Sequence, residues 1–281
     1  MVTNQLLVSV IIPNHNYGRF LDTTIQSVLD QTYLNIEIIV VDNASTDNSR
    51  SVLESFGEKI TCYFLDNNGQ ANARNFGIEK SKGKYIALLD ADDYWHPDKI
   101  SRQMILLNQS SQFNFTGIAQ FDNDSGDILR VIKPRFKGQC SRYFVDYPEI
   151  AIIPGGESSA LFSRDLFDKV AGFNVELETA SGRDFYRKIT KFTEIDFIEE
   201  SLAFQRMHSS SMSRNLAKMT SDTIRANQIM FKDPLWDLDI KTQKKILRRL
   251  EWSFLKTWLK KFAIVDSIKS MKKLITLTIK I

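Results

Sequence analysis

The segment that most constrains the fold runs from Tyr85 to Asp93 and reads Y-I-A-L-L-D-A-D-D. Its unbroken apolar run is typical of a strand covered on both faces, as in a parallel sheet. The carboxylates of Asp90, Asp92 and Asp93 follow directly. Ligands of open α/β sheets bind beyond the carboxyl ends of the strands. Because side chains two apart on a strand point the same way, we expect Asp90 and Asp92 to face one ligand.

Clustered carboxylate oxygens suit a hard divalent cation, Mg²⁺ or Mn²⁺, that is shared with substrate phosphates. The alternative is a polar strand end at which Asp92 or Asp93 caps the next helix. The residues of this segment alone leave both interpretations open.

Three further apolar runs precede this segment, and each of them ends in a polar loop. They are Val8 to Ile12, Ile36 to Val41 and Ile60 to Leu65. Apolar residues at helical spacing separate the first two runs, so the chain begins as a βαβ unit of an α/β domain. Neither G-x-G-x-x-G nor G-x-x-x-x-G-K-[ST] occurs, which disfavours dinucleotide-binding and P-loop proteins. A metal would have to supply much of the positive charge for any bound phosphate.

The second half of the chain is less regular. Two runs, 113–121 and 128–132, flank the polar segment 122–127 and predict a hairpin. Two short strands are expected at 195–198 and 201–205. Helical spacing returns after residue 215, most clearly over 240–262.

Two residues of this half are candidates for chemistry. Asp184 precedes Phe185 and Ile189 at helical spacing, which places it in a first helical turn. There it is either a carboxylate favoured by the helix dipole or a general base at the edge of an acceptor pocket. His208 is either a hydrogen-bonded loop residue or an imidazole ligand, which Mn²⁺ accepts more readily than Mg²⁺.

Composition limits the class of protein. Hydrophobic residues make up 43% of the 281 positions and charged residues 25%, as in ordinary globular proteins. The two cysteines provide no disulfide framework and no metal-ligand spacing, so we expect a reduced, cytoplasmic setting. The first apolar run leads straight into Pro13, as in a strand and unlike a signal peptide. No apolar run is long enough to span a bilayer.

Positive charge is concentrated in the last 41 residues. This tail holds 12 Lys or Arg against Glu251 and Asp266, although the whole chain carries only +3. A basic amphipathic helix with Trp and Phe suits an anionic membrane surface. The alternative is a helix docked on its own domain with a solvated basic face. No base-stacking or base-reading motif accompanies the tail, so nucleic acid is not an expected partner.

Several motifs in this order resemble the inverting glycosyltransferase family 2, which has the GT-A fold. The resemblance covers residues 6 to about 213, and its segments are S-V-I-I-P-N-H-N at 9–16, V-D-N-A-S-T-D at 41–47, Asn68-Gly69, A-R-N-F-G at 73–77, G-K-Y-I at 83–86 and L-D-A-D-D at 89–93. It implies a mixed sheet flanked by helices over residues 1–215. Residues 216–281 lie outside the shared pattern, and their helical spacing predicts a basic amphipathic helical extension. The chain departs from the family at Asp42-Asn43-Ala44 and at Arg183, where Glu is frequent.

The resemblance also implies roles for individual residues. Those expected at the donor are Pro13, His15, Asn16, Asp42, Asn68, Arg74, Asp90 and Ala91. Asp92 would bind Mn²⁺ or Mg²⁺, and His208 matches a position that contacts metal or diphosphate in some members. Asp184 matches the carboxylate that deprotonates the acceptor hydroxyl.

The expected function is therefore transfer of a sugar, with inversion, from a nucleotide-diphosphate donor to a hydroxyl of a glycan or lipid-linked acceptor. Uridine is the expected base, and surface polysaccharide synthesis at the cytoplasmic membrane face is the expected setting. The alternative is a catalytically silent module that binds sugar nucleotides or acts as a scaffold. Which sugar and which acceptor are used, and the oligomeric state, are not visible in the sequence.

Overall fold

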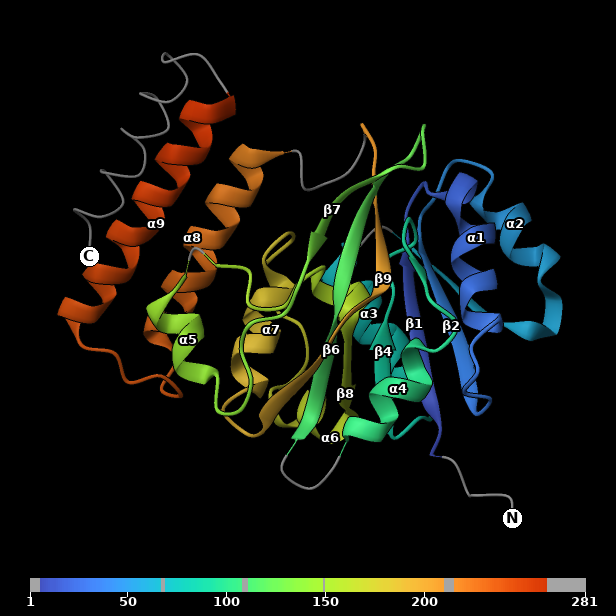
Figure 1. Cartoon of the computed structure of the whole chain (residues 1–281), viewed down its shortest axis with the longest axis horizontal. Helices are drawn as coiled ribbons and strands as arrows, with labels where there is room; N and C mark the ends of the chain where they lie inside the picture. Colours follow the sequence, from blue (N-terminus) through green and yellow to red (C-terminus); the bar gives the residue numbers. More distant parts are fainter. Residues whose placement is uncertain (1–5, 67–68, 108–110, 149, 210–214, 262–281) are drawn as a thin grey trace.

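A computed structural model describes residues 6–66, 69–107, 111–148, 150–209 and 215–261. One mixed sheet runs through the molecule in the order β3-β2-β1-β4-β8-β6-β9-β5, with β7 paired to β6 (Figure 1). The strands are β1 (Val8–Asn14), β2 (Ile36–Asn43), β3 (Thr61–Leu65), β4 (Tyr85–Leu88), β5 (Tyr94–Trp95), β6 (Ser111–Asp122), β7 (Ile128–Ile132), β8 (Ala160–Ser163) and β9 (Glu194–Met207).

The helices include two short 3-10 turns. They are α1 (Gly18–Leu29), α2 (Ser49–Ser55), η1 (Gly57–Lys59), α3 (Gln70–Lys80), α4 (Lys99–Leu106), α5 (Ser141–Asp146), η2 (Gly156–Ser159), α6 (Arg164–Lys169), α7 (Ser181–Ile189), α8 (Leu216–Lys232) and α9 (Ile240–Lys261).

The first four predicted strands form the parallel half of the sheet, as expected from their apolar runs. β1 pairs in parallel with both β2 and β4, and β2 pairs with β3. Alternate residues of β1 enter two different cores: Ile11 packs with α3, whereas Val10 and Ile12 pack with α1. Cover on both faces explains why these strands read as continuous hydrophobic runs.

The other half of the sheet is mixed. β8 lies between β4 and β6 and is antiparallel to both, while β9 is parallel to β6. The predicted hairpin of β6 and β7 is confirmed. The two short strands expected at 195–205 are one strand, β9, whose register shifts opposite Gly117. A Cβ on Gly117 would meet the Glu199 carbonyl oxygen at 2.5 Å, so this glycine admits the bulge.

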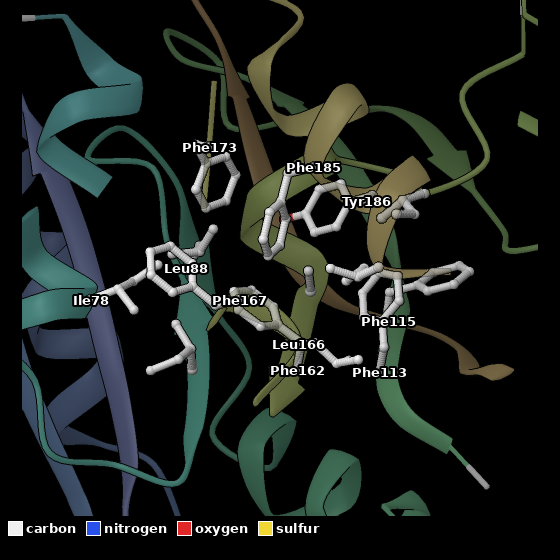
Figure 2. Packing of buried hydrophobic residues seen from close by; sticks show 14 of the residues in the cluster. Ile78, Leu88, Phe113, Phe115, Phe162, Leu166, Phe167, Phe173, Phe185 and Tyr186 are labelled. Carbon is white, nitrogen blue, oxygen red and sulfur yellow. The ribbon is translucent and has the colours of Figure 1, made fainter. Parts of the chain in front are cut away.

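An aromatic cluster fills the core where α6 and α7 cover the sheet (Figure 2). The rings of Phe173 and Phe185 stack with their centroids 4.2 Å apart, and Phe167 lies against both. Phe185 belongs to α7 and Phe173 to the loop that follows α6. The cluster therefore anchors the amino-terminal turn of α7, where Asp184 lies.

The carboxy-terminal helices α8 and α9 lie side by side at the end of the molecule opposite α1 and α2 (Figure 1). Met230, Trp236 and Leu250 are buried together with Val145 of α5. Asp222 Oδ2 of α8 accepts hydrogen bonds from the backbone N–H groups of Thr179 and Ala180, at 2.7 and 2.8 Å. These helices therefore pack on the sheet domain. The predicted boundary at residue 215 stays a prediction.

Candidate functional site

The acidic segment lies in a turn at the carboxyl end of β4. β4 ends at Leu88, and the Asp93 N–H donates to the Asp90 carbonyl at 3.0 Å. The prediction that strand alternation orients Asp90 and Asp92 is therefore wrong, because the chain has left the strand. Even so, both side chains reach one pocket, since the turn closes over the end of the sheet. The residues that line it are Pro13, Tyr17, Gln70, Arg74, Asp90, Ala91, Asp92, Asp93, Glu157, Glu178, Thr179, Gln205, Arg206, Met207 and Met219.

Asp93 is the structural member of the acidic turn. It is only 1% exposed, and it accepts hydrogen bonds from Ser158 Oγ at 2.6 Å and from the Arg206 N–H at 3.0 Å. Burial, and next the charges of Asp92 and Asp90, raise its pKa well above the usual aspartate value. Asp93 therefore joins the turn to both η2 and β9.

Asp92 and His208 form the candidate metal pair. His208 Nε2 lies 2.9 Å from Asp92 Oδ2, and the imidazole packs among the rings of Tyr17 and Phe20. Burial and the charge of Asp90 raise the pKa of Asp92, while His208 opposes that shift. No group of three His, Cys, Asp or Glu suited to a metal occurs among the described residues. A carboxylate beside an imidazole fits a divalent ion that takes its other ligands from a donor diphosphate.

Arg74 of α3 joins two carboxylates that line the pocket with it. Its side chain is buried, with Nη2 3.0 Å from Asp90 Oδ1 and Nη1 2.9 Å from Glu157 Oε1. Gln70, one turn earlier on α3, also donates to Asp90 at 3.3 Å. The small residues of α3 that pack on β1 and β2 allow this close approach, since a Cβ on Gly77 would meet Ile11 at 2.5 Å.

The other expected donor residues divide into two groups. Pro13 and Ala91 line the pocket with Arg74, Asp90 and Asp92. His15, Asn16 and Asp42 are not among the lining residues, and instead they tie the loop after β1 to the loop after β2. Asp42 accepts from Asn14 at 2.7 Å, His15 Nδ1 lies 2.7 Å from the Asn43 carbonyl, and Asn16 accepts from the Thr46 N–H at 2.7 Å. Asn68 lies outside the described residues.

Asp184 lies in the first turn of α7, as predicted, but it does not line the pocket. Its side chain is 0% exposed. Oδ1 pairs with Arg187, and Oδ2 lies 2.9 Å from Lys188 Nζ. Arg187 in turn donates to the Ala226 carbonyl of α8 at 3.1 Å. This environment makes Asp184 a link between α7 and α8 and separates it from the acidic turn. Its predicted role as a base stays untested.

Sequence reasoning missed Glu157, Glu178 and Arg206. Glu157 follows two glycines in P-G-G-E, a polar break in an apolar stretch that marks a loop and gives no sign of its partner. Arg206 Nε donates to the Asp92 carbonyl at 2.9 Å and so stabilises the acidic turn from β9. The Arg74–Glu157 and Asp92–Arg206 contacts join residues 83 and 114 positions apart, beyond the reach of any local pattern.

The fold is that of known nucleotide-sugar enzymes with the GT-A architecture. The S. aureus TarS 1–349 structure in complex with UDP-GlcNAc aligns with a TM-score of 0.72 at 14% identity, covering 98% of this chain and 81% of TarS. The mannosyltransferase PcManGT from Pyrobaculum calidifontis, solved with GDP-Man and Mn²⁺, aligns with a TM-score of 0.64 at 17% identity, covering 99% and 81%. The expected mixed sheet with flanking and carboxy-terminal helices is confirmed.

The chain belongs to glycosyl transferase family 2, whose model matches residues 9–171. An uncharacterized glycosyltransferase of Rickettsia typhi is 31% identical over 83% of this chain and 71% of its own length. The chain spans only 36% of a similar Rickettsia conorii protein, which is 34% identical over 75% of this chain. The putative teichuronic acid biosynthesis glycosyltransferase TuaG of Bacillus subtilis is 40% identical over 45% of this chain and 52% of its own length.

Proposed function

We propose that this protein is a metal-dependent inverting glycosyltransferase that moves a sugar from a nucleotide-diphosphate donor, with uridine as the expected base, to a hydroxyl of a glycan or lipid-linked acceptor in surface polysaccharide synthesis. The observation that carries the proposal is the acidic turn, where Asp92, which lines the pocket together with Arg74, lies 2.9 Å from His208. The nucleotide sugars bound by TarS and PcManGT, and the name of TuaG, support the donor class and the setting.

The residues of the pocket fit the electrostatics of this reaction. Negative charge develops on the leaving diphosphate as the anomeric C–O bond breaks. A divalent cation bound by Asp92 and His208 would supply positive charge to that leaving group. Asp90, held by Arg74 and Gln70, faces the same pocket and is placed to accept hydrogen bonds from the donor. Inversion then requires a base on the opposite face of the sugar.

The first experiment is a thermal-shift screen of nucleotides and nucleotide sugars with Mn²⁺, followed by assays of donor hydrolysis and transfer. Binding raises the melting temperature according to ligand concentration and affinity. We expect a uridine diphosphate sugar to give the largest shift, and EDTA to remove both the shift and the turnover. If no nucleotide sugar shifts the melting temperature, the proposed function is wrong.

A catalytically silent sugar-nucleotide-binding module is the second candidate. It is favoured by the burial of Asp184, because that carboxylate is engaged by Arg187 and Lys188 and does not line the pocket. Donor binding without hydrolysis or transfer, with or without Mn²⁺, would favour this candidate.

We also propose that α9 contacts an anionic membrane surface. None of the described helices is long and apolar enough to cross a membrane. α9 buries Ile246, Leu247 and Leu250 against the domain. Its opposite side presents a shallow groove lined by Ile240, Lys241, Lys244, Lys245, Arg248, Arg249 and Trp252. Trp252 is 65% exposed, and an aromatic ring among basic residues suits a headgroup region.

A further inference from the structure

We propose that Glu157, rather than Asp184, is the general base that takes the proton from the acceptor hydroxyl. This inference rests on the proposed glycosyl transfer and names a residue for its acceptor side. It follows from a comparison of the carboxylates that line the pocket, from the way in which Glu157 is held, and from its charged neighbours.

Of the five carboxylates that line the pocket, three already have a structural or ligand-binding role in the proposed site, and one is largely exposed. Asp92 lies against His208, and Asp90 is bound by Arg74 and Gln70. Asp93 is enclosed by the bonds from Ser158 and Arg206. Glu178 is 60% exposed and pairs with Lys218 at the rim.

Glu157 combines partial burial with an available oxygen. Its side chain is 17% exposed, and Oε1 lies 2.9 Å from Arg74 Nη1. This contact occupies Oε1 and leaves Oε2 for a further partner. A base needs one oxygen that can reach the incoming hydroxyl, and a second contact that fixes its orientation. Glu157 meets both requirements.

The backbone holds Glu157 at this position. Gly155 and Gly156 have φ of 63° and 51°, the left-handed region that glycine adopts most readily. The next residue, Ser158, fixes η2 to the acidic turn, because its hydroxyl donates to Asp93 and accepts from the Asp90 N–H at 3.2 Å. On the other side, a Cβ at Gly182 would lie 2.1 Å from Glu157 Oε1. The absence of a side chain at position 182 thus leaves room for the Glu157 carboxylate beside the first turn of α7.

The charged groups around Glu157 set the direction in which its pKa shifts. Burial raises its pKa, the guanidinium of Arg74 from α3 lowers it, and Asp90 after β4 raises it again, with a raised pKa as the result. Tyr186 of α7 also faces this carboxylate, and the charge of Glu157 helps to raise the pKa of its phenol. A carboxylate with a raised pKa is a stronger base than an ordinary glutamate.

The acceptor oxygen forms a bond to the anomeric carbon while its proton passes to Glu157 Oε2. The bond from the anomeric carbon to the diphosphate oxygen breaks, and its electron pair leaves with the nucleotide diphosphate. Protonated Glu157 returns its proton to water after the product departs.

The test compares four variants of the full chain: Glu157→Gln, Glu157→Asp, Asp184→Asn and the surface control Glu199→Gln. Glu199 is 67% exposed and pairs with Lys133. Each variant is measured for melting temperature, for the donor-induced thermal shift with Mn²⁺, and for kcat of transfer as a function of pH.

We expect Glu157→Gln to lower kcat by about 10²–10⁴-fold while the donor-induced shift is retained. Glu157→Asp keeps a carboxylate and should recover part of the turnover, with a displaced acidic limb in the pH profile. That limb should be missing in Glu157→Gln. Glu199→Gln should behave like the wild type, and Asp184→Asn should act mainly on the melting temperature.

Two results would overturn the inference while leaving the proposed function intact. One is a folded Glu157→Gln protein with wild-type kcat and an unchanged acidic limb. The other is a folded Asp184→Asn protein that binds donor but loses turnover while Glu157→Gln keeps it. A wild-type protein that binds no donor would instead end the proposed function, and the role of Glu157 with it.

Discussion

At the scale of single residues, the site is organised by one cation, Arg74, between two carboxylates. Asp90 follows β4 and Glu157 lies in η2, so the guanidinium joins segments from the parallel and the mixed halves of the sheet. A lysine has one compact ammonium group and cannot form this forked contact. The identity of residue 74 therefore affects both sides of the pocket.

Asp92 is predicted to control the metal dependence of donor binding. Asp92→Asn keeps the shape of the side chain and removes its charge, so we expect the extra thermal shift that Mn²⁺ gives to a nucleotide-sugar complex to disappear. The exposed Asp127→Asn variant is the matched control. An undiminished response to Mn²⁺ in Asp92→Asn would remove Asp92 from the metal site.

Asp93 is predicted to make stability depend on pH. Its folded-state pKa is raised, so the folded protein binds a proton more tightly than the unfolded chain does. The favourable contribution of protonated Asp93 to the free energy of unfolding is therefore greatest at low pH. This contribution is lost as the pH rises from 3.8, the ordinary pKa of aspartate, through the raised pKa of Asp93 in the folded protein. Asp92 shifts in the same direction. Urea unfolding in EDTA measures the free energy of unfolding at each pH. For Asp93→Asn this free energy should vary less with pH than for the wild type, and an identical variation with pH would contradict the prediction.

At the scale of elements, helix α7 has two functions that sequence alone did not separate. Gly182 lies against Glu157 of η2, whereas Asp184 and Arg187 form the link to α8. The helical spacing predicted that Asp184 lies in a first turn. The spacing did not predict which way the side chain faces, because that depends on the packing of α8 some 40 residues later.

Gly182→Ala tests the contact between α7 and η2. The new methyl group would meet Glu157 Oε1, so the glutamate must move and turnover should fall. Alanine is favoured over glycine inside a helix by about 1 kcal/mol, so stability should change little. A double-mutant cycle provides the control: in a Glu157→Ala background, Gly182→Ala should have no further effect on turnover. Equal losses in both backgrounds would show that the contact is not responsible.

Asp222 of α8 is predicted to stabilise the loop that leads into α7. Oδ2 accepts from the Thr179 and Ala180 N–H groups and from Thr179 Oγ1, at 2.7, 2.8 and 3.1 Å. Because hydrogen bonds to a charged acceptor contribute about 1.5–3 kcal/mol, Asp222→Ala should lower the free energy of unfolding by at least that amount. Urea denaturation measures the change. Asp168→Ala, at an exposed position of α6, should be nearly neutral, and a neutral Asp222→Ala would show that the loop is held by other contacts.

The parts of the fold that sequence predicted are those encoded locally. The apolar runs of β1 to β4 and the hairpin of β6 and β7 are such cases, because strand periodicity and turn residues lie within each segment. The insertion of β8 between β4 and β6, and the single bulged β9, depend on pairing between distant segments. The same distinction holds at the site: the acidic cluster at the end of β4 was predicted, whereas its turn geometry and the contact of Glu157 with Arg74 were not.

At the scale of the whole molecule, the acidic pocket and the basic groove on α9 are lined by different elements. The acidic turn and its pocket lie at the carboxyl end of β4. Helix α9 lies next to α8 at the far end of the molecule (Figure 1), and its basic residues line a separate groove. Because α9 buries Ile246 and Leu250, removal of the tail after residue 215 would expose a core surface as well as remove charge. Charge substitutions are therefore a cleaner test of membrane contact than truncation.

The variant Lys244→Glu/Lys245→Glu/Arg248→Glu is predicted to lose binding to anionic vesicles. Each basic residue near such a surface contributes about 1 kcal/mol, so the triple change should weaken binding by at least about a hundredfold. Flotation with phosphatidylserine vesicles, compared with neutral vesicles, measures the effect. The matched control is Lys59→Glu/Lys80→Glu/Lys84→Glu, at exposed positions far from α9. Equal flotation of both variants would argue against a membrane role for α9.

The aromatic cluster around Phe185 has a practical consequence for protein engineering. The family match stops at residue 171, between Phe167 and Phe173, although these two rings and Phe185 pack as one group. A fragment cut at that point would lose β9 and α7 and leave half of the cluster open to water. The shortest portion suitable for expression, grafting or chimera design therefore reaches at least to Leu250, the last described buried apolar contact of α9.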